Sequence, residues 1–472
     1  MKGRQQSSSG SKGRRARRGP PRHRPGPPAD AREAVLRVVG TQATGFPSIK
    51  ILEPDTSGLD PRDSALAHAL HESVLRRWLT IRWLLEQRLE RPFPEMHPAL
   101  QASLLVGGAQ ILFMDRIPVH AAIDTSVEWA KRSAGRGGAG LVNAVLRRLS
   151  EMLRGGPEGP EKAERYGGGR EEVPLSDGGS LMLTQPILPE DDDFRLAVAT
   201  GMPKRLCERW ALAAGARAAR DLALHSLVHP PVVINAVHAE APIDPELASP
   251  HRCAGHFVFA GERGSLGGLL TGRRDVWVQD SASSAPAMLA SQLKPAVIAD
   301  LCAGQGTKTR QLRRLFPDAK IVASDIDKDR LQTLRGVFDG DGQVEAVAPD
   351  ELREAWLEKV DLVVLDVPCS NTGVLARRVE AKYRFGPDLI ERLGDTQRQL
   401  IADSIPLLAP KGKILYATCS LEAEENEAMA AWAGKWHGFK VEASERLTPA
   451  GLPGEGPEVY RDGSFGVLLG RS

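Results

Sequence analysis

The chain has 472 residues, of which 42% are hydrophobic and 26% charged, with a formal net charge of +2. This is the composition of a folded globular protein with enough chain for two to four domains. No apolar run reaches the roughly 18 residues of a membrane span, and the start, MKGRQQSSSGSKGRR, lacks the apolar segment of a signal peptide. The five cysteines are sparse, odd in number and without metal-site spacing. We therefore expect a cytoplasmic protein without a membrane segment or bound metal.

Residues 1–29 form a basic segment, with nine Lys or Arg residues and no Asp or Glu. Ser, Gly and Pro fill the remainder, which predicts disorder. An arm that contacts nucleic-acid phosphates and a tail that only aids solubility explain this composition equally well. A mitochondrial presequence is a weaker alternative, because the prolines from Pro20 to Pro28 oppose the amphipathic helix that it requires.

Residues 30–150 have helical periodicity throughout. Three apolar stripes carry this prediction: Leu66, Leu70, Val74, Leu75, Trp78 and Leu79; Leu100, Leu104, Leu105, Ile111 and Leu112; and Leu141, Val142, Val145, Leu146 and Leu149. No strand-like alternation interrupts them, so we expect an all-α domain. The Gly-rich sequence GRGGAG at 135–140 predicts a turn before the last helix, either a plain loop or a place where free N–H groups meet a phosphate.

The middle of the chain divides into two predicted parts. Residues 151–190 are rich in Gly, Pro and Glu, which predicts a flexible linker. Helical spacing returns after Asp191, and PPVVINAVHA at 230–239 alternates as a strand does. We expect a small α+β subdomain over residues 191–280, ending in a strand that runs into a helix within 272–290.

Residues 281–472 have the pattern of a Rossmann-like α/β domain. AVIADLCAGQGTKTRQLRRLF (296–316) is an apolar strand, a Gly-containing turn and a helix, and KIVASDID (320–327) is a second strand. Asp325, 19 residues after Gly306, is placed to accept ribose hydroxyls. The third Gly of a dinucleotide motif is missing, because position 309 is Thr. This favours S-adenosylmethionine, which has no phosphate, over NAD; an ordinary strand–helix turn without a cofactor is the alternative.

Two cysteines follow buried strands in the same half of the chain. VDLVVLDVPCSNTGVLARR (360–378) places Asp366 and Cys369 after one strand, and KGKILYATCSLEAEENE (411–427) places Cys419 after another. In an open parallel sheet that edge is where ligands bind. Methylation of cytosine at carbon 5 requires such a set: a thiolate that adds to carbon 6, an acid near ring nitrogen 3, and a base that later removes the carbon 5 proton.

These motifs, together with the terminal DGSFGVLL, resemble the Sun/Fmu (RsmB-like) 16S ribosomal RNA cytosine-C5 methyltransferases. The segment IPVHAAIDTSVEWAKRSAGRGGAGLVNAVLRRLS (117–150) resembles part of a NusB-type RNA-binding domain. The resemblance implies a multidomain chain, with a NusB-like helical domain followed by an S-adenosylmethionine-dependent methyltransferase domain. It further implies a monomer that acts on small-subunit ribosomal RNA.

The resemblance also assigns roles. Cys419 would be the nucleophile, Cys369 would assist product release, and Asp366 would contact both the target cytosine and the methyl donor. The remaining cofactor contacts would be Cys302, Ala303, Gly304, Gln305, Gly306, Thr307, Lys308, Asp325 and Asp350. Lys308 could also reach the active site.

The chain departs from the family pattern in two places. The family turn CAAPGGKT is CAGQGTKT here, so Gln305 replaces Pro and Thr307 replaces Gly. A side chain at position 307 would be strained if that position required a positive φ. The family's Arg-Val-Asn in the small subdomain is Val233-Ile234-Asn235, which removes an arginine.

Two alternative functions stay open. The same chemistry could act on transfer RNA or large-subunit ribosomal RNA, or the chain could be an RNA-binding assembly factor with weak catalysis. The three residues Asp366, Cys369 and Cys419 disfavour the second alternative, because a scaffold has no chemical need for them. RNA binding should be electrostatic, with a basic face near Arg313, Arg314, Arg377 and Arg378.

Overall fold

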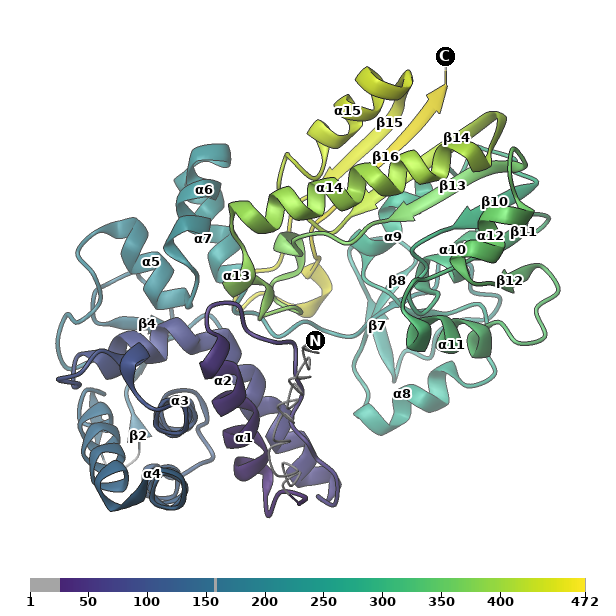
Figure 1. Ribbon diagram of the computed structural model, residues 1–472. Coiled ribbons are helices and arrows are strands. Elements are labelled where there is room, and N and C mark those ends of the chain that lie inside the picture. Colours follow the sequence, from purple (N-terminus) through teal and green to yellow (C-terminus); the bar gives the residue numbers. More distant parts are fainter. Residues whose placement is uncertain (1–25, 157–158, 472) are drawn as a thin grey trace, which may run out of the picture.

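The computed structural model describes residues 26–156 and 159–471, and Figure 1 shows them as two lobes. One lobe holds the helices of the N-terminal third and the other holds the large sheet. The predictions for the basic segment 1–29 concern mainly residues 1–25, which lie outside the described residues.

The N-terminal lobe is helical, as predicted. Its elements are α1 (Ala31–Gly45), α2 (Pro61–Glu86), the 3-10 turn η1 (Phe93–Glu95), α3 (Pro98–Phe113) and α4 (Val119–Ser150). The Asp30 and Asp60 side chains accept hydrogen bonds from backbone N–H groups at the starts of α1 and α2. Helix α3 is buried along nearly its whole length, so it forms the centre of this domain.

The predicted break before the last helix is present but shorter than the Gly-rich sequence 135–140. Element α4 consists of two helices that meet at a kink at Gly135, whose backbone is not helical, with φ 75° and ψ −175°. A single glycine in a left-handed conformation kinks the helix, and the following residues return to helical geometry.

The structure also corrects the expectation of a flexible linker at 151–190. This segment forms β1 (Gly155–Gly156) paired with β2 (Gly159–Pro160), and a three-stranded sheet of β3 (Lys162–Ala163), β5 (Ser180–Met182) and β4 (Glu172–Pro174). Its apolar residues Val173, Leu181, Leu183 and Leu188 are buried in the core of the helical domain. Composition alone missed them because Gly, Pro and Glu outnumber them.

Residues 191–280 form helices and a small sheet. The helices are α5 (Asp192–Thr200), α6 (Lys204–Ala214), α7 (Ala216–His225) and α8 (Arg263–Leu270). The sheet has the order β7 (Ala248–Pro250), β8 (His256–Phe259), β6 (Val233–Asn235), β9 (Trp277–Val278). The predicted strand within 230–239 is β6, and β9 leads into the next helix.

The second lobe is built on a seven-stranded mixed sheet, which confirms the Rossmann-like prediction. The strand order is β12 (Val344–Ala346), β11 (Lys320–Ala323), β10 (Val297–Asp300), β13 (Val360–Asp366), β14 (Leu408–Thr418), β16 (Ser464–Arg471), β15 (Phe439–Leu447). The first five strands are parallel, and β16 runs antiparallel between β14 and β15. The chain reverses its direction of progress across the sheet between β10 and β13, which is the point where such folds bind ligands.

Helices cover both faces of this sheet. The apolar residues of α9 (Ser281–Met288), α10 (Thr307–Leu315) and α11 (Lys328–Val337) pack in one core. Those of α12 (Pro349–Ala355), α14 (Pro387–Ser404) and α15 (Glu427–His437) pack in another. The short turns η2 (Thr372–Val374), η3 (Ile405–Leu407) and η4 (Pro457–Val459) complete the lobe. No helix in the described part of the chain is long and apolar enough to cross a membrane.

Helix α13 (Ala381–Arg384) joins the two lobes and lies between them in Figure 1. The buried Lys382 ammonium donates a hydrogen bond to the carbonyl of Arg76 on α2 at 2.7 Å, and the Tyr383 hydroxyl donates to the carbonyl of Leu75 at 2.5 Å. The Arg76 guanidinium in turn donates to the carbonyl of Ala376 at 2.9 Å. These buried bonds fix the helical domain to the lobe that holds the seven-stranded sheet.

Candidate active site

The cofactor loop, residues 301–306, connects β10 to α10. Gly304 and Gly306 have φ angles of 58° and 89°, in the left-handed region that favours glycine. A Cβ on Gly306 would lie 2.7 Å from the Phe338 ring and 2.9 Å from Leu334, so this position has no room for a side chain. The loop therefore presents backbone rather than side chains at the ends of the strands.

The two replaced positions of this loop create no backbone strain. Thr307 is the first residue of α10 and, among the described residues, the non-glycine residues with positive φ are Glu358 and Asn371. Gln305 and Thr307 are both exposed. The strain that a side chain at position 307 would cause under a positive φ is therefore absent. The two glycines on either side of Gln305 adopt the left-handed conformation instead.

Asp325 lies directly beside the cofactor loop. One oxygen of its carboxylate accepts the N–H of Gly304 at 2.9 Å, and the other accepts the N–H of Asp327 at 2.9 Å. Asp350 lies in the first turn of α12, after the neighbouring strand β12, and is exposed without a hydrogen bond or ion pair to the other site residues. The structure therefore brings Asp325 to the loop and leaves Asp350 at its margin.

These features fit S-adenosylmethionine. The left-handed glycines allow close approach of the ligand to the backbone, and a carboxylate follows the second strand at the height of the loop, where it can accept ribose hydroxyls. Cys302 and Ala303 belong to the same loop. Burial, together with the carboxylates of Asp300, Asp366 and Asp325, raises the pKa of Cys302 to about 12, so its thiol stays protonated and does not compete as a nucleophile.

Lys308 and Asp366 form an ion pair across the point where the sheet reverses direction. The Lys308 ammonium lies 2.8 Å from the Asp366 carboxylate and 3.4 Å from the Ser283 hydroxyl. Burial lowers the pKa of Lys308, but the negative charge of Asp366, the hydrogen bond to it and the neighbouring Cys419 outweigh burial, so the net shift is upward. A fixed cation next to a cysteine stabilises its thiolate. The side chain of Asp366 is 38% exposed, which leaves it accessible to a substrate.

The two cysteines predicted as catalytic meet side by side. Their Sγ atoms are 3.1 Å apart, although 50 residues separate them in the chain. Cys369 is buried and Cys419 is partly exposed. The hydrogen bond with Cys419, burial and the charge of Glu425 raise the pKa of Cys369 well above its usual range. The more accessible Cys419 is therefore the better placed nucleophile.

Glu425 connects the loop that carries Cys369 with the loop that carries Cys419, here called the cysteine loops. Sequence reasoning assigned it no role. Its buried carboxylate accepts hydrogen bonds from the N–H and hydroxyl of Ser370, at 2.9 and 2.5 Å, and from the hydroxyl of Ser420 at 2.5 Å. Gln397 adds a fourth bond at 3.0 Å. Each of the two cysteines is thus followed by a serine that donates a hydrogen bond to the same carboxylate. The sequence LEAEEN holds several acids, and nothing in the pattern distinguishes the buried one.

Two glycines bring the loops into backbone contact. The N–H of Gly373 donates to the carbonyl of Cys419 at 2.9 Å, and the N–H of Gly463 donates to the carbonyl of Gly373 at 2.7 Å. A Cβ on Gly373 would lie 2.8 Å from the Cys419 carbonyl oxygen. The C-terminal DGSFGVLL motif is therefore linked through Gly373 to the loop that carries Cys419.

Asn371 and Asp300 are two further residues that sequence reasoning missed. Asn371 adopts a left-handed conformation, accepts a 3.4 Å hydrogen bond from the Cys419 thiol and donates to the carbonyl of Cys369 at 2.8 Å. Asp300, fully buried at the end of β10, accepts a 2.7 Å bond from Thr309. Burial, opposed by this bond and reinforced by the charge of Asp366, raises the pKa of Asp300 to about 7.

One expected basic residue is already neutralised. The Arg377 guanidinium pairs with Asp462 at 2.6 Å and with Asp280 at 3.2 Å. The same is true of Arg313 and Arg314 on α10, which pair with Asp341 at 3.3 Å and with Glu240 at 2.7 Å. Among the described residues, no group of three or more His, Cys, Asp or Glu side chains could hold a metal ion.

Comparison with known proteins agrees with this geometry. Residues 287–445 match the family model of the 16S rRNA methyltransferase RsmB/F, and residues 30–151 match that of the NusB family. The crystal structure of PH0851 has a TM-score of 0.67 at 19% identity and covers 92% of this chain and 98% of its own, which supports the fold.

Named relatives extend over most of the chain. The ribosomal RNA small subunit methyltransferase B of Xanthomonas campestris is 31% identical over 381 residues, covering 78% of each chain. That of Vibrio cholerae is 28% identical over 420 residues, covering 87% of this chain and 90% of its own. The probable counterpart from Bacillus subtilis is 25% identical over 455 residues, covering 93% and 94%. The chain therefore belongs to the ribosomal RNA small subunit methyltransferase B family and is an S-adenosylmethionine-dependent methyltransferase.

Proposed function

We propose that the protein methylates carbon 5 of a cytosine in small-subunit ribosomal RNA through a covalent adduct with Cys419. The observation that carries this proposal is the contact of two strand-end cysteines, with sulfurs 3.1 Å apart, beside the Lys308–Asp366 ion pair. A methyltransferase acting on an oxygen or an exocyclic nitrogen needs neither thiol. The names of the relatives support ribosomal RNA as the substrate.

The reaction begins at Cys419. Attack of its thiolate on carbon 6 of the cytosine forms a carbon–sulfur bond and shifts the electrons of the 5,6 double bond to carbon 5. The proton that the Cys419 thiol gives up passes to Asp366, which shares it with ring nitrogen 3 and so stabilises this electron-rich ring. S-adenosylmethionine supplies the methyl group that carbon 5 takes up. Loss of the carbon 5 proton to a base then restores the double bond and expels the Cys419 thiolate.

The surrounding residues serve these steps in distinct ways. Lys308 places a positive charge beside Cys419 and Asp366, which favours the thiolate before attack. We assign the release stage to Cys369, because its sulfur lies next to the sulfur that must leave. The target base must be unpaired or flipped out of a helix to reach Cys419.

Tritiated methyl transfer to unmodified small-subunit ribosomal RNA, with transfer RNA and large-subunit RNA in parallel, tests the proposal. The variants are Cys419→Ala and Cys369→Ala, with Cys253→Ala as the matched control because Cys253 is exposed and outside the site. We expect Cys419→Ala to lose transfer by at least roughly 10³-fold, the scale seen when a nucleophile is removed. Cys369→Ala should accumulate a denaturation-resistant RNA–protein adduct.

Each result bears on a separate part of the proposal. Transfer to transfer RNA alone would retain the chemistry and replace the substrate. Full activity of a folded Cys419→Ala variant would refute the covalent mechanism. Binding of RNA and S-adenosylmethionine by the wild type, without transfer to any of the three RNAs, would favour an RNA-binding assembly factor.

A further inference from the structure

A pocket lined by arginines lies between α8, α10 and α11, about 410 Å³ in volume. Its charged lining residues are Arg273, Arg274, Arg310, Arg313, Arg314 and Asp341. We call it the arginine pocket. It is separate from the cysteine site, and it lies where the predicted subdomain 191–280 meets the catalytic lobe.

Three of the five arginines are neutralised within the protein. Arg273 pairs with Asp275 at 2.6 Å, Arg313 with Asp341 at 3.3 Å, and Arg314 with Glu240 at 2.7 Å. In each of these ion pairs the positive charge of the arginine is balanced by the carboxylate, so the three pairs add no net charge to the pocket.

The remaining two arginines have no anionic partner. Within residues 26–156 and 159–471, neither the Arg274 nor the Arg310 guanidinium makes an ion pair or a hydrogen bond. Half-burial lowers the pKa of Arg310, and the positive charge of Arg274 lowers it further, so the two cations repel one another. Close unpaired cations in a pocket are a physical signature of a site for an anion.

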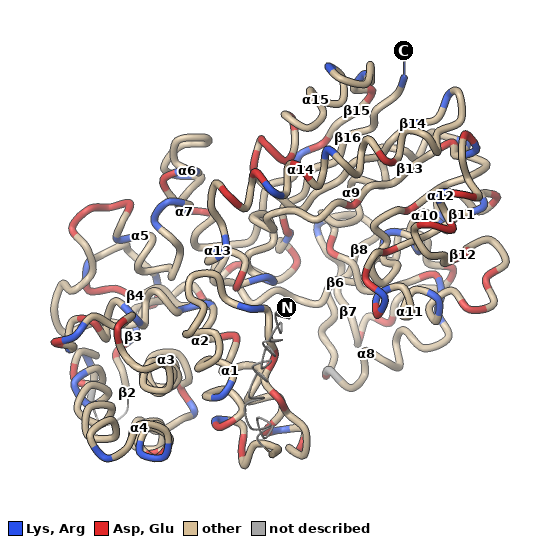
Figure 2. The backbone as a smooth tube through the Cα atoms, viewed as in Figure 1, with Lys and Arg blue, Asp and Glu red and all other residues tan. Residues whose placement is uncertain are grey.

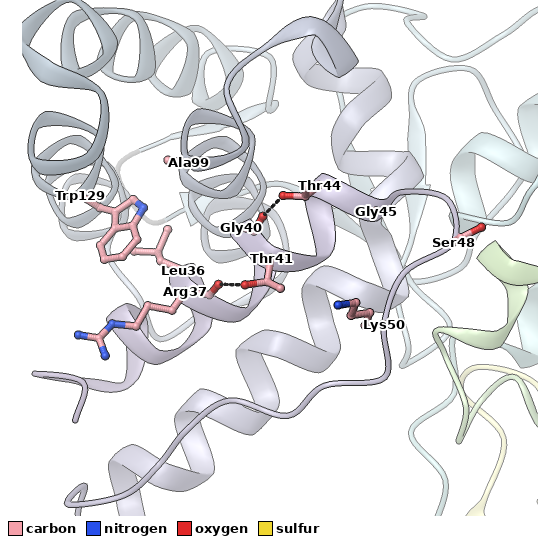
Figure 3. A pocket seen from close by; sticks show the side chains of 10 residues that line it. All are labelled: Leu36, Arg37, Gly40, Thr41, Thr44, Gly45, Ser48, Lys50, Ala99 and Trp129. Carbon is pink, nitrogen blue, oxygen red and sulfur yellow. Dashed lines mark hydrogen bonds between the residues drawn. The ribbon is translucent and has the colours of Figure 1, made fainter. Parts of the chain in front are cut away.

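The pocket of the helical domain in Figure 3 provides a contrast. It is about 460 Å³ and also holds basic residues, Arg37 and Lys50. Its hydroxyls, however, are used within α1: Thr41 and Thr44 donate to the carbonyls of Arg37 and Gly40, each at 3.1 Å. Arg37 pairs with Glu33 at 2.5 Å. The arginine of that pocket is therefore paired and its remaining cation, Lys50, is exposed, whereas the arginine pocket holds two neighbouring guanidinium groups without an anionic partner.

The position of the arginine pocket relates it to the reaction. Thr307, Arg310 and Arg314 are spaced by three and four residues along α10, so they share one face of that helix. Thr307 adjoins the cofactor loop, and the arginines follow from it toward the other end of α10. A nucleic-acid strand that leaves the active site along this face meets the two unpaired guanidinium groups.

The local charge is not part of a general positive field. The whole chain has a net charge of only +2, and Figure 2 shows basic and acidic positions interspersed along most of it. Guanidinium groups match phosphate geometry through paired N–H donors. We propose that the arginine pocket binds phosphate groups of the RNA strand that carries the target cytosine. This proposal rests on the proposed function and names a second contact for the same substrate.

The test compares Arg274→Gln/Arg310→Gln with wild type by RNA-binding titrations at several salt concentrations. The probe is a fluorescent fragment of unmodified small-subunit ribosomal RNA. Loss of two phosphate contacts should reduce the slope of log affinity against log salt by about 1.4, and affinity at 0.1 M salt by roughly 25-fold. The KM for RNA should rise more than kcat falls. Arg274→Lys/Arg310→Lys, which keeps the charge, should recover most of the salt slope.

The matched control is Arg392→Gln/Lys411→Gln, which removes two exposed charges on α14 and β14. It should leave the salt slope within 0.3 of wild type. An unchanged slope in a folded Arg274→Gln/Arg310→Gln variant would overturn the proposal. A second contrary outcome concerns inorganic phosphate as a competitor of methyl transfer. If the Arg274→Gln/Arg310→Gln variant loses only its inhibition by phosphate and keeps wild-type RNA binding, the pocket binds free anions and not RNA. The proposed function and this inference can fail separately. If the wild type transfers no methyl group but still has a steeper salt dependence of RNA affinity than the Arg274→Gln/Arg310→Gln variant, the proposed function is refuted and this inference stands.

Discussion

The cysteine loops and the cofactor loop meet at one edge of the sheet but are held in different ways. The cysteine loops are joined by buried polar bonds to Glu425 and by backbone contact at Gly373. The cofactor loop is held mainly through its backbone. The N–H groups of Leu301 and Ala303 donate to the carbonyls of Val364 and Ser324, and that of Gly304 donates to the Asp325 carboxylate. The loop turns at left-handed glycines and exposes Gln305 and Thr307. The difference matches the two proposed tasks: the proposed covalent chemistry requires fixed side chains, whereas cofactor binding requires a backbone shape that tolerates side-chain replacement.

The largest effect should come from the centre of the cysteine loops. Glu425→Ala leaves the N–H and hydroxyl of Ser370 and the hydroxyl of Ser420 without their acceptor. At about 1–3 kcal/mol for each buried unsatisfied group, we expect a loss of at least 3 kcal/mol in unfolding free energy and at least 100-fold in methyl transfer. Urea denaturation and tritium transfer measure the two. Glu424→Ala is the control, because this neighbour makes a surface ion pair with Arg209 and should cost under about 1 kcal/mol. Equal effects of the two variants would refute the role of Glu425.

The second largest effect should come from Gly306→Ala in the cofactor loop. Its φ of 89° and the 2.7 Å approach of Phe338 oppose any side chain. Strain of about 1–3 kcal/mol should weaken S-adenosylmethionine binding roughly 5- to 150-fold, with far less change in RNA binding. Isothermal titration calorimetry measures the S-adenosylmethionine affinity, and an unchanged affinity would show that the loop shape is not required.

Asp300 predicts a pH dependence of stability. Its folded pKa of about 7 lies above its ordinary value of 3.8, so the folded protein retains a proton that the unfolded chain has lost. This contribution is fully present below pH 4 and is lost as the pH rises to 7, at up to about 1.4 kcal/mol per pH unit. Asp300→Asn should flatten the unfolding free energy measured by urea between pH 4.5 and 7.5. Parallel curves for wild type and variant would exclude Asp300 as the source.

Thr307→Gly should have the smallest effect. Position 307 starts α10 without positive φ, so the family's glycine has no conformational advantage here. We expect S-adenosylmethionine affinity within about twofold of wild type and a helix weakened by up to about 1 kcal/mol. Calorimetry and thermal unfolding measure these. A large gain in affinity would mean that the Thr307 side chain does obstruct the cofactor, which would erase the contrast between the two loops.

Much of the fold was predictable because its signals are local. The stripes around Leu70 and Leu104 follow helical spacing, and strands such as Val360–Asp366 are uninterrupted apolar runs. The linker prediction failed because burial of Val173 and Leu181 depends on a partner surface, the core of the helical domain. The predicted turn at 135–140 is confined to Gly135, because the last helix tolerates the three glycines that follow.

The sequence by itself determined which groups are proposed to react and the strand ends on which they lie: Asp366, Cys369, Cys419 and the Gly304–Gly306 turn. This follows because strand and turn signals depend on neighbouring residues. Only the tertiary structure decided which distant groups meet, namely the two sulfurs, Lys308 with Asp366, Glu425 with both serines, and the unpaired Arg274 with Arg310. The physical reason is that hydrogen bonding, burial and charge pairing depend on spatial separation, which the order of strands in the sheet sets and sequence distance does not.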